Sequence, residues 1–350
     1  MDNAVVPDTQ DKLKAYKTVC LKLGLVMCVF YVCRLISGFI IMLFLNESPI
    51  APDSTLHYIL RTIIMIFFYY AVPIAVSGAL FKSLDYYARG SGRLRQLFSK
   101  PKRFAQNLGS FPAVYGLGQS VNLLTMLVFF LFTLVFTRLG GTFELERYFD
   151  QIALETPNNL TSAAIMVVLM VVVAPVAEEF LARGIMFDAL KPFGYGIAIV
   201  ISSILFGLMH SSLHMLFYTT ALGLALGYVR YATNSLLVVT VLHMLVNAIA
   251  AGMVFILAVT EVTDGESQLV NTISTIYIIS MLTMVVVGLA AFFKRIPRIR
   301  KYKIERNWDE LSGKRKLGIF LASVSVIFML ILAADAHSNH ILINRLISSG

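Results

Sequence analysis

The sequence is poor in charge. Only 14% of its 350 residues are charged, whereas 58% are hydrophobic, and the mean hydropathy is +0.78. A soluble domain carries about 25% charged residues, and a soluble chain of this size still needs a polar surface around its core. The shortage of charge excludes a soluble globular enzyme, and the apolar excess excludes a disordered chain. The composition therefore predicts an all-α, polytopic membrane protein.

Cysteine is scarce as well. Cys20, Cys28 and Cys33 all lie in the first apolar segment, with a spacing that matches neither a metal motif nor a disulfide framework. We interpret them as packing or lipid-facing residues. The polar N-terminus lacks the charged region and short apolar stretch of a cleaved signal, so we expect the first helix to be retained.

Long apolar runs, by contrast, are abundant. A membrane span needs about 20 apolar residues, and nine segments qualify. The segments 195–212 and 214–231 are short and almost contiguous, so the count falls to eight if one of them is re-entrant. Gly223 and Gly227 form a small-xxx-small pair that predicts close helix packing. The nine segments are 19–45, 58–81, 111–137, 161–190, 195–212, 214–231, 235–259, 269–293 and 317–334.

Basic residues concentrate in two loops. Residues 82–103 hold seven Lys and Arg and residues 294–316 hold ten, out of 29 in the chain, whereas 46–57 and 260–268 hold none. The positive-inside rule places the basic loops in the cytoplasm, which nine spans with a cytoplasmic N-terminus satisfy. The net charge of +9 is thus an orientation signal. We expect the protein to have a lipid bilayer, and no nucleic acid, as its partner. The short loops between the spans favour a bacterial plasma membrane as its location.

The chain divides into three membrane regions without a separate soluble domain. We predict an N-terminal region at 1–155, a catalytic core at 156–260 and a C-terminal region at 261–350. Insertion of an ionisable group into the membrane as part of a span costs about 2.5–3.5 kcal/mol on insertion scales. Such groups are therefore paired with another group or serve a function. The middle region gathers the polar residues in apolar surroundings, namely Glu178, Glu179, Arg183, His210, His243 and Asn247.

The two adjacent glutamates have different predicted roles. Glu179 and Arg183 are four residues apart and share a helix face, so they can neutralise each other. Glu178 is rotated by about 100°, which leaves its carboxylate free to meet another helix and to act as a general base.

The two histidines lie on separate segments. His243 and Asn247 share one helix face, and this imidazole and amide can donate hydrogen bonds to an oxyanion. A carboxylate and two imidazoles can activate a water molecule, with or without a metal. For His210 to meet Glu178, the segment 195–212 must begin late, tilt or unwind.

Three motifs occur in order: Glu178-Glu179-Phe-Leu-Ala-Arg183, Phe206-Gly-Leu-Met-His210 and His243-Met-Leu-Val-Asn247. Together they resemble the CPBP intramembrane proteases (CAAX proteases and bacteriocin-processing enzymes, or Abi family), which include the type II CAAX prenyl endopeptidases. The resemblance covers about residues 160–255.

The resemblance implies a role for each matched residue. Glu178, assisted by His210, would activate the water, while His243 and Asn247 would polarise the carbonyl and stabilise the oxyanion. Glu179 and Arg183 would orient the first motif.

The cofactor stays open at this stage. The family is usually described as metal-dependent, so Glu178, His210 and His243 would be the ligands of a zinc ion, but a metal-free glutamate mechanism is also compatible. The sequence lacks the His-Glu-x-x-His motif of soluble zinc proteases.

Three functions remain open from the sequence. The leading one is an intramembrane endopeptidase that hydrolyses a membrane-associated or lipid-modified peptide, whether a prenylated CAAX protein, a bacteriocin or another substrate. The second is a catalytically silent family member that acts as a scaffold, immunity or regulatory protein. The third is a proton-coupled transporter that uses the Glu and His residues as a relay, although the sequence shows no inverted repeat. The oligomeric state is not predicted.

Overall fold

The structure is a computed structural model that describes residues 9–46, 48–51, 54–81, 99–139, 159–210, 213–262, 268–301 and 311–337. Within these ranges all regular secondary structure is helical, and no strand occurs. The predicted all-α polytopic membrane fold is confirmed. Residues 82–98 of the first basic loop and 302–310 of the second lie outside the described residues.

Six of the described helical stretches are long and apolar enough to cross a membrane. The first contains α1 (Thr9–Ile40) and the second contains α2 (Thr55–Ile66), the π-helix η2 (Phe67–Ala71) and α3 (Val72–Phe81). The six stretches are Thr9–Leu45, Thr55–Phe81, Phe104–Arg138, Leu160–Phe193, Leu236–Ile256 and Asn271–Ile296.

The remaining predicted spans correspond to other helices. The pair α16 (Gly313–Leu321) and α17 (Val324–His337) is bent by 70° and adds a seventh stretch if it crosses as one unit. The two short segments become α12 (Tyr195–Leu208), which has 14 residues, and α13 (Leu213–Thr233), which has 21. Neither is among the six long apolar stretches, so the number of spans stays a prediction.

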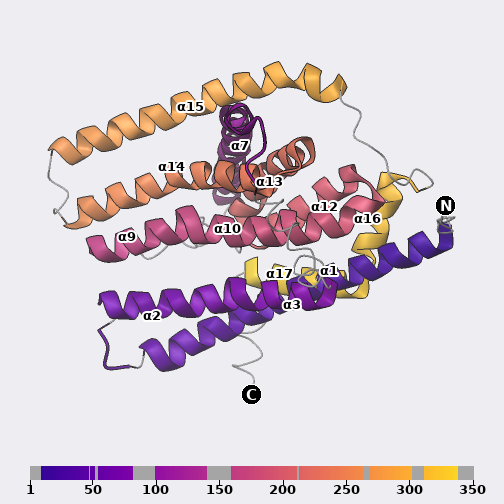
Figure 1. Ribbon diagram of the computed structural model, residues 1–350. Helices are drawn as coiled ribbons and strands as arrows, with labels where there is room; N and C mark the ends of the chain where they lie inside the picture. Colours follow the sequence, from indigo (N-terminus) through magenta and orange to yellow (C-terminus); the bar gives the residue numbers. More distant parts are fainter. Residues whose placement is uncertain are drawn as a thin grey trace.

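The helices pack in rows (Figure 1). The fourth stretch begins with α9 (Leu160–Val168), the π-helix η4 (Leu169–Val173) and α10 (Ala174–Glu179). This stretch lies between the pair α2 and α3 on one side and α14 (Leu236–Val262) on the other. The fourth stretch is therefore contacted by the helices on both of its sides.

Two further helices cover this arrangement on the side of α14. Helix α15 (Gln268–Lys301) packs on α7 (Phe111–Arg138), and α7 also contacts α13. A Cβ atom on Gly116 of α7 would lie 2.2 Å from the Gly288 carbonyl carbon of α15, so the two backbones touch at this crossing. Large apolar side chains are exposed on α7 from Leu123 onward and on α15 between Ile273 and Phe293, as on lipid-facing helices.

Small residues also join α13 to α12. A Cβ atom on Gly223 would lie 3.0 Å from Ser203 Cβ, and one on Gly227 would lie 3.2 Å from Ile199 Cγ2. Close packing of this glycine pair, predicted from its spacing, is confirmed. The contact holds α13 against the helix that leads to His210.

Candidate active site

The buried ion pair Glu179–Arg183 forms the base of the site. Arg183 lies in the π-helix η5 (Phe180–Met186), and its Nη1 donates a 2.8 Å hydrogen bond to Glu179 Oε1. Both side chains are fully buried. Arg183 Nη2 also donates to the Gly223 carbonyl, at 3.0 Å. The pair predicted from the four-residue spacing is present, and it attaches the first motif to α13.

His243 of α14 connects the two glutamates. Its Nδ1 lies 2.9 Å from Glu179 Oε1, and its Nε2 lies 3.9 Å from Glu178 Oε2. Because Glu179 already accepts from Arg183, its carboxylate acts as the acceptor and Nδ1 as the donor. The Nδ1 bond therefore fixes the ring orientation and leaves Nε2 directed toward Glu178.

Glu178 contacts a second helix as well. Tyr70, in η2, donates a hydrogen bond from its hydroxyl group to Glu178 Oε1 at 3.1 Å. The expectation that this carboxylate meets another helix is met twice, by Tyr70 and by His243. Sequence reasoning missed Tyr70, because a tyrosine in an apolar run carries no signal of its contact 108 residues away.

His210 lies just past the end of its helix. Helix α12 ends at Leu208, so the segment unwinds before His210, which is one of the three arrangements expected from its depth. Its Nδ1 is 3.0 Å from the Phe206 carbonyl oxygen. Of the two imidazoles, that of His243 is the one that lies within ion-pair distance of Glu178.

Phe206 occupies the centre of the cluster. Its ring centroid is 5.2 Å from that of His210 and 5.6 Å from that of His243, and both contacts are edge-to-face. The Arg183 guanidinium lies over the same ring, at 4.4 Å. The aromatic residue of the second motif thus joins the three polar motifs through its ring, which spacing alone does not reveal.

Asn247 lies one turn beyond His243 but bonds elsewhere. Its Nδ2 donates a 2.9 Å hydrogen bond to the Met170 carbonyl oxygen in η4. A π-helix departs from the regular α-helical hydrogen-bond pattern, so a side chain can pair with a carbonyl there. The amide group has a second N–H, which remains for another acceptor.

The donor chemistry suits zinc, but the side chains are not gathered around a single point. Each histidine engages Nδ1, with Glu179 or with a backbone carbonyl, as histidine ligands of metals do. Yet among the described residues, no three His, Cys, Asp or Glu side chains form a group that could hold an ion. The zinc site at Glu178, His210 and His243 stays a prediction.

Arg34 of α1 is a second residue that sequence reasoning missed. Its Nη1 donates to the Met209 carbonyl oxygen at 3.3 Å, and its guanidinium lies 5.1 Å from the Tyr69 ring centroid. The sequence does mark this residue, because a lone arginine within an apolar span is by itself a candidate functional residue. The cation borders the site on the side of His210 and Tyr70.

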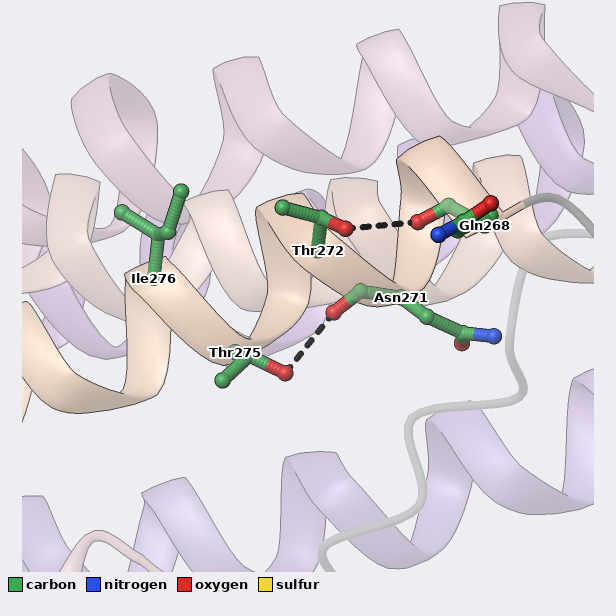
Figure 2. Close-up of a pocket in the computed structure, with 5 residues that line it drawn as sticks. All are labelled: Gln268, Asn271, Thr272, Thr275 and Ile276. Carbon is green, nitrogen blue, oxygen red and sulfur yellow. Dashed lines mark hydrogen bonds between the residues drawn. The ribbon is translucent and has the colours of Figure 1, made fainter.

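A shallow depression of about 420 Å³ lies elsewhere, at the start of α15 (Figure 2). The Thr272 and Thr275 hydroxyl groups in it donate to the carbonyls of Gln268 and Asn271 on their own helix. These polar groups are already satisfied, and the depression shares no residue with the glutamate and histidine cluster.

One comparison with known proteins bears on this cluster. Residues 160–249 match the family model described as type II CAAX prenyl endopeptidase, Rce1-like. The resemblance to the CAAX protease family is thereby confirmed over this segment, and it points to a peptidase within a multi-pass membrane protein. No curated protein and no solved structure matched the chain. The matched segment contains all three motifs but neither Tyr70 nor Arg34.

Proposed function

We propose that this chain is an intramembrane endopeptidase that hydrolyses a peptide bond of a lipid-modified or membrane-associated substrate. The observation that carries the proposal is the linkage of Glu178 to His243 and of His243 to Glu179, with distances of 3.9 Å and 2.9 Å. A carboxylate that faces an oriented imidazole is suited to proton transfer. The match of residues 160–249 to a prenyl endopeptidase family supports this substrate class.

Glu178 starts the reaction in this proposal. Its Oε2, on the side of His243, takes a proton from a water molecule, and the resulting hydroxide attacks the scissile carbonyl carbon. Tyr70 holds Oε1 and so fixes which carboxylate oxygen faces the water. The protonated Glu178 later gives the proton to the leaving amine as the C–N bond breaks, so atoms and charge balance.

The tetrahedral oxyanion requires hydrogen-bond donors. We assign this role to the second N–H of Asn247 and to the Nε2–H of His243 in its imidazolium form, one turn apart on α14. Because Glu179 accepts from His243 Nδ1, Nε2 is the nitrogen left to donate to the oxyanion. Removal of one such donor in other enzymes lowers kcat by about 10²–10³.

Cleavage of a prenylated CAAX peptide by the purified protein tests the proposal. Glu178→Ala and His243→Ala should each lower kcat by at least about 10², the usual contribution of a general acid or base. Asp11→Asn is the control, because Asp11 is an exposed carboxylate at the start of α1. Full activity in both site variants would contradict the proposal, and a proton flux that depends on Glu178 would favour transport instead.

A further inference from the structure

Arg34 is a cation inside the apolar span Thr9–Leu45. A charged side chain within a membrane is costly, so it is retained where it has a partner or a function. Among the ion pairs of the described residues, none joins Arg34 to a carboxylate. Within the described part of the chain, no carboxylate therefore lies at ion-pair distance from this guanidinium.

Two contacts hold the guanidinium on one edge. Nη1 donates to the Met209 carbonyl just after the last residue of α12, and the Tyr69 ring lies at 5.1 Å from the group. Cations are favourable at helix C-termini, so this contact has a structural role of its own. A guanidinium has five N–H donors, however, and within the described ranges the Met209 contact is the hydrogen bond that Arg34 makes. The other edge is left for a ligand.

The position of Arg34 relates it to the candidate active site. Met209 directly precedes His210, and Tyr69 directly precedes Tyr70, which donates to Glu178. An anion bound to Arg34 would thus lie near Tyr70, the residue that holds Glu178 in the proposed reaction.

We propose that Arg34 binds a carboxylate of the peptide substrate and thereby selects the peptide bond that reaches Glu178. This inference rests on the proposed function. A guanidinium pairs with a carboxylate through two parallel hydrogen bonds, and the low dielectric of the membrane strengthens such a pair. The carboxylate is either the C-terminal group or an Asp or Glu side chain, since these are the carboxylates that a peptide carries.

Binding of three fluorescent prenylated peptides to the full chain tests the inference. One peptide ends in a free carboxylate, the second in an amide, and the third is the amide with one added Glu. Binding is measured in the Glu178→Gln background, so that it is independent of turnover. We expect at least one carboxylate peptide to bind about 10-fold more tightly than the plain amide, equivalent to about 1.4 kcal/mol. Arg34→Gln should abolish this difference, and Arg34→Lys should keep part of it.

Lys22→Gln is the matched control. Lys22 is a second cation on α1, about 18 Å along the helix from Arg34, and it also lies over an aromatic ring, that of Phe81. The control should leave the preference unchanged. Preference for the free carboxylate alone identifies the C-terminus as the ligand, and preference for the Glu peptide alone identifies a side chain.

Other outcomes would overturn the inference. If Arg34→Gln weakens binding of all three peptides equally, the arginine only supports the end of α12, and the inference fails while the proposed function stands. A change in retained anionic lipid, with no change in peptide preference, has the same consequence. If the Glu178→Gln chain binds none of the peptides and the unsubstituted chain cleaves none of them, both proposals fail.

Discussion

The Tyr70 hydroxyl group donates a 3.1 Å hydrogen bond to Glu178 Oε1. The tyrosine comes from the π-helix η2, outside the segment that matches the prenyl endopeptidase family, whereas Glu178 lies inside it. A helix of the N-terminal region thus contributes directly to the candidate active site. The other oxygen of this carboxylate faces His243.

Loss of the Tyr70 hydroxyl group should weaken turnover more than substrate binding. In Tyr70→Phe the ring is kept but Glu178 loses a donor, so its orientation toward the water is less well fixed. We expect kcat to fall by about 10-fold, in line with one hydrogen bond to a charged group, at an unchanged KM. Tyr58→Phe, on the preceding helix α2, is the control and should retain normal kinetics. A change in KM alone would show that Tyr70 contacts the substrate and does not position Glu178.

Removal of one member of the ion pair Glu179–Arg183 should destabilise the fold. Arg183→Leu leaves a carboxylate in a fully buried environment, and such a loss costs about 3–5 kcal/mol. Unfolding of the detergent-solubilised protein measures the effect. The double variant Glu179→Leu/Arg183→Leu should be more stable than Arg183→Leu, because no unpaired member of the pair remains. A double variant that is less stable than the single one would contradict this electrostatic account.

A methyl group at Gly223 should disturb the site from a distance. Its Cβ would lie 3.1 Å from the Ser203 Cα and 3.2 Å from Arg183 Nη2, so both the helix contact and the hydrogen bond to the Gly223 carbonyl would be strained. We expect Gly223→Ala to lower both thermal stability and activity. Gly227→Ala is the matched control, because its nearest neighbour is the Ile199 side chain, which can shift. Equal effects of the two variants would show that helix packing alone is responsible.

Asn247 offers a test of the oxyanion assignment. Asn247→Ala removes the bond to the Met170 carbonyl and the second N–H together. We expect kcat to fall by about 10² or more, with a smaller change in substrate affinity. Asn122→Ala on α7, which removes a hydrogen bond to Gln119, should leave peptide cleavage intact. If Asn247→Ala changes stability but not the rate of cleavage by the folded protein, the amide has a structural role only.

Parts of the site could be read from spacing. The Glu179–Arg183 pair follows from two residues four apart on a helix, and the pair forms although the second half of that segment is a π-helix. The presence of His243 near the glutamates was expected from its polar character in an apolar span. Its contact with both carboxylates was not, because side-chain directions between two helices depend on how those helices pack.

An all-α membrane protein, and the polar residues that mark its candidate active site, could be inferred from the amino-acid sequence, because an apolar background makes each intramembrane charge conspicuous. Three contacts depend on how the helices pack: Tyr70 reaches Glu178, Arg34 donates to the Met209 carbonyl, and Phe206 joins the motifs. These contacts connect residues far apart in the chain. They depend on the end of α12 at Leu208 and on the π-helices η2 and η4, none of which hydrophobic periodicity predicts.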